Sequence, residues 1–140
     1  MSLYNSEILR LATSVAGFER LPEAHASAEK RSSVCGSRVT VDVCLDAIGK
    51  VDALGLDVRA CALGQASAAL MAAEVKGRSL GELEGARDDL AAFLDERRND
   101  PGAWPGLAIF APAIPHRARH PAILLAFDAV AEAVRAAARR

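Results

Sequence analysis

The sequence predicts an α+β protein, in which a small antiparallel sheet of about three strands is packed on one face by helices. One observation is the segment RVTVDVCLD (38–46), where an apolar residue at every second position is typical of a half-buried strand. The other is helical spacing of apolar residues both before and after this region. The order is a helix, a run of strands and then helices, which favours α+β over a parallel α/β sheet.

The N-terminal segment predicts one amphipathic helix. Tyr4, Ile8, Leu11 and Val15 follow helical spacing, and the helix is expected to end near Gly17. The following residues, ERLPEAHASAEKRSS, are polar and include a proline. We expect them to form a loop that leads into a short edge strand.

The two central strands are predicted to form a hairpin. In the first strand, one set of side chains is expected to face the core: Val39, Val41, Val43 and Leu45. The alternate set is expected to face away from it: Arg38, Thr40, Asp42 and Cys44. A turn at AIGK, in which Gly49 tolerates positive φ, leads to the second strand, VDALGLDVRA. Leu54, Leu56 and Val58 share a face there, but Val51 and Ala53 are out of phase, which predicts either a bulge or a late strand start near Ala53.

The second half of the chain is predicted to be mainly helical. One helix runs from Gly64 to about Val75, and Ser79 with Glu82 forms a capping box that opens the next. The segment 99–120 contains four prolines and is expected to be an extended connection or a lid. Pro121 suits the first turn of a last helix. With no internal repeat, residues 1–140 are expected to form a single domain.

Composition narrows the function classes. The net charge of −1 provides no strong field for nucleic acid or anionic lipid, and the 4% of aromatic residues argues against base stacking. No secretory signal is visible, and the most apolar segment, 60–75, is too short to span a membrane. We therefore expect a soluble, cytoplasmic protein whose three cysteines are reduced thiols rather than a disulfide framework.

Two of the cysteines are candidate functional residues. Cys35 precedes the first strand of the predicted hairpin and Cys61 follows the second, so both are expected at the same end of the sheet. Cys61 also precedes a helix, whose N-terminal amides favour a thiolate. This placement suits a reactive or metal-binding thiol; the alternative is that both are small buried residues packed under a helix. Cys44, in the middle of a strand, is interpreted as an ordinary strand residue.

Among the histidines, His120 is the candidate ligand. It directly precedes Pro121, and it would approach both thiols if the start of the last helix faces the same end of the hairpin. The alternative is a surface or capping residue. No nucleophile has a dedicated general base beside it, and no phosphate loop is present, which favours a carrier over an enzyme.

Nearly the whole chain resembles the IscU/SufU/NifU-type iron–sulfur cluster assembly scaffolds. LYNSEILRLA is similar to the opening helix of that family, and SVCGSRVTVDVCLD to the segment with Cys-Gly-Asp and a strand. GKVDALGLDVRACALGQASAALMAAEVKGRSLGEL is similar to its cysteine-bearing strand-to-helix junction, and PHRARHPAILLAFDAVAEAV to the segment with its third cysteine. The long insert between Val75 and His116 resembles the SufU branch.

The resemblance implies a SufE/NifU-like fold and a site for an Fe–S cluster or zinc on three cysteines plus Asp or His. Carried onto this sequence, Cys35 is the first ligand and Cys61 the second. Ser37, a weak ligand, stands at the position of the Asp, and no cysteine lies near Ala122, where the third is expected. His120 is the candidate substitute; a ligand donated by a partner and an empty site are the alternatives.

The function implied by the resemblance is therefore that of a scaffold. It would hold a labile Fe–S cluster or metal, or accept sulfur, on Cys35 and Cys61. The implied partners are a cysteine desulfurase and Fe–S assembly factors, with no nucleic acid and no membrane, and the chain is expected to be a monomer or weak homo-oligomer. The alternative is a metal-free interaction or regulatory protein on the same fold that binds a desulfurase or another assembly factor.

Overall fold

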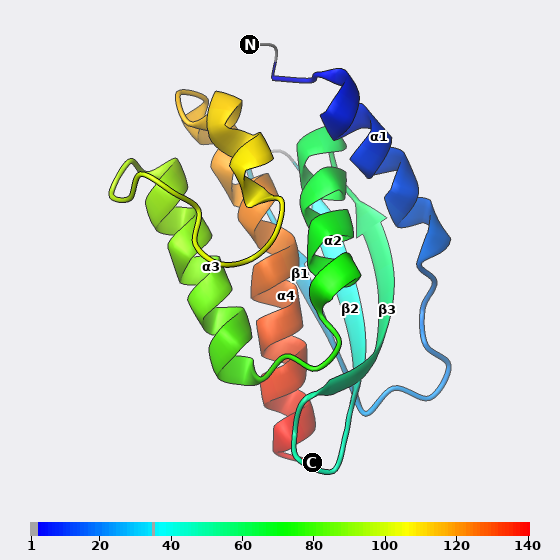
Figure 1. Ribbon diagram of the computed structural model, residues 1–140. Coiled ribbons are helices and arrows are strands. Elements are labelled where there is room, and N and C mark those ends of the chain that lie inside the picture. Colours follow the sequence, from blue (N-terminus) through cyan, green and yellow to red (C-terminus); the bar gives the residue numbers. More distant parts are fainter. Residues whose placement is uncertain (1–2, 35) are drawn as a thin grey trace.

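The computed structural model describes residues 3–34 and 36–140, and its helices cover one face of a three-stranded antiparallel sheet (Figure 1). This arrangement confirms the predicted fold class. Cys35 lies outside the described residues. The elements in chain order are α1 (Ser6–Ser14), η1 (Val15–Gly17), β1 (Ala26–Arg31), β2 (Arg38–Leu45), β3 (Val51–Arg59), α2 (Ala62–Glu74), α3 (Leu80–Leu94), η2 (Leu107–Ala113), η3 (Arg117–Arg119) and α4 (His120–Ala138).

The sheet has the strand order β1-β2-β3, so the predicted hairpin supplies its central strand and one edge. Arg38 pairs with Arg59 at one end of the hairpin. At the other end Cys44 pairs with Ala53 but Leu45 pairs with Val51. The residue between Ala53 and Val51 is therefore the extra one, so of the two predicted alternatives the bulge is present, and β3 does not start late.

Helices α2 and α4 pack on the inner face of the sheet, and α1 and α3 flank them (Figure 1). The valines of β2 that were predicted to face the core are fully buried there: Val39, Val41 and Val43. Ser79 caps α3 as predicted, since its Oγ accepts from Glu82 N–H and its own N–H donates to Glu82 Oε1, both at 3.2 Å. Pro121 lies in the first turn of α4. Over the described residues, none of the helices combines the length and apolar character needed to cross a membrane.

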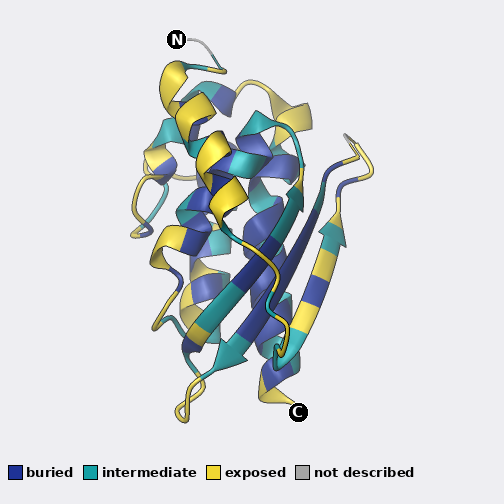
Figure 2. Ribbon diagram, turned by 90° about the vertical axis from the view of Figure 1, so that its right-hand side faces the viewer, coloured by how far each residue is buried: buried dark blue, intermediate teal, exposed yellow. Residues whose placement is uncertain are grey.

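The outer face of β2 is more buried than predicted. Asp42 has no exposed surface, and β2 is buried along most of its length (Figure 2). The cause is the segment after η1, which crosses this face, with the carbonyl of Glu19 accepting from Leu56 N–H at 3.2 Å. A Cβ at Gly55 would lie 2.5 Å from the nitrogen of Leu21, so only glycine leaves room for the crossing.

The proline-rich segment is not the extended connection or lid that was predicted. It contains η2 and η3, and Trp104, Leu107 and Phe110 are buried. The indole Nε1 of Trp104 donates to the carbonyl of Leu70 at 3.0 Å, and the ring stands edge-on to Phe127 with centroids 5.3 Å apart. Prolines exclude a regular α-helix here, but burial of the apolar side chains between them against the helices still stabilises a packed arrangement.

Candidate functional site

Cys61 lies at the junction that the sequence predicted, between the end of β3 and the first turn of α2. It is the N-cap residue of α2, with extended backbone at φ −64° and ψ 170°, and its carbonyl accepts from Gln65 N–H at 3.0 Å. Its side chain makes no capping hydrogen bond and is half-buried. The free amides of a helix N-terminus favour negative charge, so this position suits a thiolate.

The start of α4 packs directly against the first turns of α2. A Cβ at Gly64 would lie 3.3 Å from the carbonyl oxygen of Ala122 and 2.8 Å from the Cβ of Ala60. One turn later, Ser67 Oγ donates to the carbonyl of Ile123 at 2.5 Å. The small residues after Cys61 thus allow the two helix N-termini to meet.

The loop between β1 and β2 lies at the same end of the sheet as Cys61, because Arg38 at the start of β2 pairs with Arg59 at the end of β3. Ser32 N–H donates to the carbonyl of Ser37 at 2.9 Å, and Ser37 is only 3% exposed. This burial makes Ser37 a poor ligand for an entering metal ion. The position of Cys35 relative to Cys61 stays a prediction.

His120 turns its ring toward the end of η2. Its Nε2 lies 2.9 Å from the carbonyl oxygen of Ala113 and 3.1 Å from that of Ile114. Carbonyl oxygens only accept hydrogen bonds, so Nε2 carries the proton and donates to both. In the neutral ring Nδ1 then has the lone pair, and it is through Nδ1 that His120 would bind a metal.

The described residues alone do not form a complete metal site. Among them, no three His, Cys, Asp or Glu side chains lie in a group that could hold a metal ion. They offer the thiol of Cys61 and the Nδ1 of His120, while Ala122 is buried where the family's third cysteine was expected. A structural zinc site generally has four ligands, so any bound metal needs donors beyond these two side chains.

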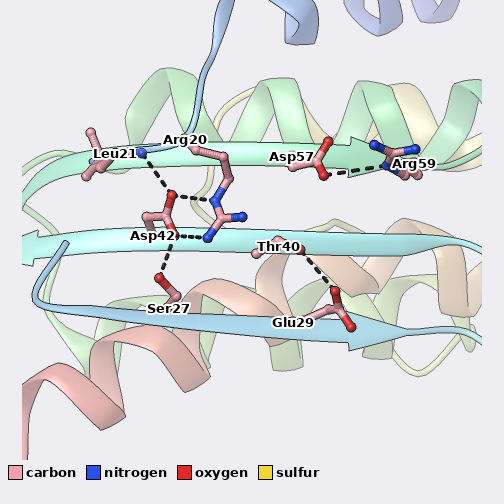
Figure 3. Close-up of polar contacts among 8 residues, drawn as sticks. All are labelled: Arg20, Leu21, Ser27, Glu29, Thr40, Asp42, Asp57 and Arg59. Carbon is pink, nitrogen blue, oxygen red and sulfur yellow. Dashed lines mark hydrogen bonds and ion pairs between the residues drawn. The ribbon is translucent and has the colours of Figure 1, made fainter. Parts of the chain in front are cut away.

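Sequence reasoning missed the buried carboxylate of Asp42 (Figure 3). It accepts from Arg20 Nε at 2.7 Å and Nη2 at 2.9 Å, from Leu21 N–H at 2.9 Å and from Ser27 Oγ at 2.5 Å. Burial raises the pKa of Asp42, but the hydrogen bonds from Arg20, Ser27 and Leu21 lower it by more, so the pKa is below its usual value. The carboxylate fastens the crossing segment to β2; no local spacing signalled this, because Arg20 belongs to a distant loop.

A charged groove of about 490 Å³ lies between β1, α3 and α4. Its three cations are all paired: Lys30 with Glu132 at 3.3 Å, Arg87 with Asp128 at 2.7 Å, and Arg135 with Glu84 at 2.5 Å. A fourth carboxylate of the groove, Asp88, lies 3.5 Å from Arg87, which it shares with Asp128, so the groove offers no unmatched positive charge to a ligand.

Comparisons with known proteins identify the family. No family model matches the sequence, and no curated protein matches it. Among solved structures, a nitrogen-fixing NifU-like protein (N-terminal) from Brucella abortus is 37% identical with a TM-score of 0.91, over 99% of this chain and 96% of that chain.

Two further solved structures share the fold at 20% identity. One is a putative iron–sulfur cluster assembly scaffold protein for the SUF system from Fervidobacterium islandicum AW-1, with a TM-score of 0.84 over 94% of this chain and 96% of that one. The other is a hypothetical protein, with a TM-score of 0.70 over 90% and 98%. Given the identity and coverage of the Brucella protein, this chain belongs to the NifU-like family of IscU/SufU/NifU-type scaffolds.

Proposed function

We propose that this protein is a carrier in iron–sulfur cluster assembly that holds a labile Fe–S cluster or metal, or accepts sulfur, on Cys61 and Cys35. The observation that carries the proposal is the position of Cys61, a free, half-buried thiol at the N-terminus of α2, in a chain that is 37% identical to a NifU-like protein. The role is one of binding and transfer rather than catalysis.

In this proposal each candidate residue has a separate role. Cys61 and Cys35 supply two thiolates, which are soft ligands for Fe–S clusters and zinc and are also sulfur acceptors. His120 supplies an auxiliary nitrogen through Nδ1, because its Nε2 is engaged by two carbonyls. Ser37 contributes little because it is buried.

A consequence of this ligand set is weak retention of the cargo. Two thiolates and one imidazole hold a cluster less tightly than three thiolates and a carboxylate. We propose that a partner completes the ligand shell during loading, with a cysteine desulfurase as the source of sulfur and other assembly factors as recipients. Zinc is the alternative cargo on the same donors.

Anaerobic reconstitution with ferric iron, sulfide and excess thiol tests the proposal. The wild-type protein should develop visible charge-transfer absorption, and Cys35→Ser and Cys61→Ser should lose it. Cys44→Ser is the matched control, because Cys44 is also a free, half-buried thiol but pairs with Ala53 at the opposite end of the β2–β3 hairpin from Arg59 and Cys61. Far-UV circular dichroism of each variant checks that the fold is retained.

Two further measurements separate the forms of cargo. Metal analysis of protein purified anaerobically reports zinc or iron, and intact mass after incubation with a cysteine desulfurase and cysteine reports added sulfur. A wild-type protein that takes up no iron, zinc or sulfur would contradict the carrier role and leave the metal-free interaction protein. Equal loss of cargo in Cys44→Ser and Cys61→Ser would contradict the assigned site.

A further inference from the structure

Three arginines stand in one row across the outer face of the sheet. Arg31 of β1 is directly opposite Arg38 of β2, which is directly opposite Arg59 of β3. Directly paired residues of antiparallel strands point to the same face, with Cβ atoms ~5 Å apart. The arginine row, defined by these three residues, therefore places three guanidinium groups side by side.

Of the residues that the structure describes, only two carboxylates, those of Glu29 and Asp57, form ion pairs with the three guanidinium groups of the arginine row. Glu29 is divided between two of them, with Oε2 2.9 Å from Arg31 Nε and Oε1 3.8 Å from Arg38 Nε. Asp57 lies 3.5 Å from Arg59 Nε (Figure 3). The hydrogen bond from Arg31 is the main cause that lowers the pKa of Glu29, so this carboxylate stays charged. Like charges opposite each other in a sheet repel, and two carboxylates compensate three guanidinium groups incompletely.

The guanidinium groups are also accessible. The side chains of Arg31 and Arg59 are each 68% exposed, and that of Arg38 is 31% exposed. Exposed ion pairs contribute little stability, so the pairs with Glu29 and Asp57 can be rearranged at low cost. The protein as a whole has a net charge of −1, so the local excess of positive charge is a property of this surface and not of the composition.

The row lies at the end of the sheet where the candidate site is found. Arg59 is the last residue of β3, and the N-cap of α2 at Cys61 follows two positions later. Arg38 begins β2 directly after Ser37. A molecule seated on the arginine row is therefore held at the same end of the sheet as Cys61.

We propose that the arginine row is a docking surface for an acidic segment of a partner protein. Guanidinium groups bind carboxylates through paired hydrogen bonds, which favours carboxylates over isolated point charges. The strands are ~4.8 Å apart, which matches the ~5–6 Å between acidic side chains one turn apart on a helix. Duplex nucleic acid is disfavoured because the chain is acidic overall and poor in aromatic residues. This inference goes beyond the carrier role, since it assigns a partner surface that contains no cargo ligand.

The test is a titration of the ¹⁵N-labelled protein with a synthetic helical peptide that carries glutamates at i, i+4 spacing. We expect saturable shifts of the backbone amides in 29–31, 38–40 and 57–59. The triple variant Arg31→Gln/Arg38→Gln/Arg59→Gln should weaken binding about tenfold, the sum of three exposed ion pairs. No metal is needed, so this result is independent of the reconstitution experiment on Cys61.

A charge-matched control replaces three exposed cations that lie outside the sheet: Arg10→Gln/Lys76→Gln/Arg139→Gln. The affinity of this control variant for the peptide should stay close to that of the wild type. The proposal is overturned if both triple variants weaken binding equally, if the peptide shifts amides elsewhere, or if duplex DNA or phosphatidylserine vesicles bind the row more tightly than the peptide does. If the triple variant does not fold, the single variants Arg31→Gln and Arg59→Gln decide between these outcomes.

Discussion

Replacing Asp42 with asparagine tests whether the buried carboxylate holds the crossing segment on the sheet. Each carboxylate oxygen accepts two hydrogen bonds in the folded protein. Asparagine keeps one of these oxygens but turns an NH₂ group toward the two donors of the other. An N–H donor cannot pair with this NH₂ group, and only the Ser27 hydroxyl, which also accepts, can turn to meet it.

The expected cost follows from the lost contacts. A hydrogen bond to a charged group contributes about 1.5–3 kcal/mol; one or two such bonds are lost, and the bonds that remain no longer meet a negative charge. The side chain of Arg20 is 53% exposed, so its freed donor returns to water and reduces the penalty. We therefore expect Asp42→Asn to lower the free energy of unfolding by about 3 kcal/mol and the melting temperature by about 10 °C. Asp57→Asn is the control: its side chain is 37% exposed with one ion pair, and it should cost about 0.5 kcal/mol.

Urea unfolding followed by the fluorescence of Trp104 measures these differences, because Trp104 is the single tryptophan and is 5% exposed. The pH dependence has a definite sign. The pKa of Asp42 is lowered in the folded state. The contribution of the carboxylate to the free energy of unfolding is therefore complete above the usual pKa of about 4, and it is lost as the pH falls through the lower pKa of the folded state. The difference in free energy of unfolding between the wild type and Asp42→Asn should therefore be constant near neutral pH and become smaller in acid.

Two results would refute this reasoning. One is an unfolding free energy of Asp42→Asn within about 0.5 kcal/mol of the wild type, or no larger than the cost of Asp57→Asn. The other is a difference in unfolding free energy that stays unchanged as the pH falls well below about 4, since a protonated Asp42 is uncharged, as asparagine is.

Two further predictions concern the helices around the site. Gly64→Ala should lower the free energy of unfolding by about 1–3 kcal/mol in urea, because its Cβ would lie 2.8 Å from Ala60 and 3.3 Å from the carbonyl of Ala122. Gly85→Ala is the control in α3, where nothing lies within 4 Å of the added Cβ, and it should raise the free energy of unfolding by up to about 1 kcal/mol. A change of the same sign in both variants would contradict the packing argument. Ser79→Ala removes the capping box of α3 and should lower the free energy of unfolding, measured by calorimetry, by about 1 kcal/mol. Ser79→Asp keeps a side-chain acceptor at this position, so it should lower the free energy of unfolding much less.

The local features of this protein could be predicted because their signals lie within a few residues. Alternating valines specify β2, and a serine and a glutamate three positions apart start α3. The bulge near Ala53 followed from a break in the same alternation. In each case periodicity or capping acts between near neighbours, so the sequence itself contains the cause.

The tertiary structure alone decided the features that depend on distant contacts. Asp42 is buried because a segment from before β1 crosses the sheet at Gly55, and the alternation of β2 carries no record of that crossing. The proline-rich segment is packed because Trp104 finds partners on other helices. The arginine row exists only through the register of three strands, which is set by hydrogen bonds between the strands and not by spacing within one of them. Local spacing determined which elements form, and the long-range burial of apolar side chains determined how they meet.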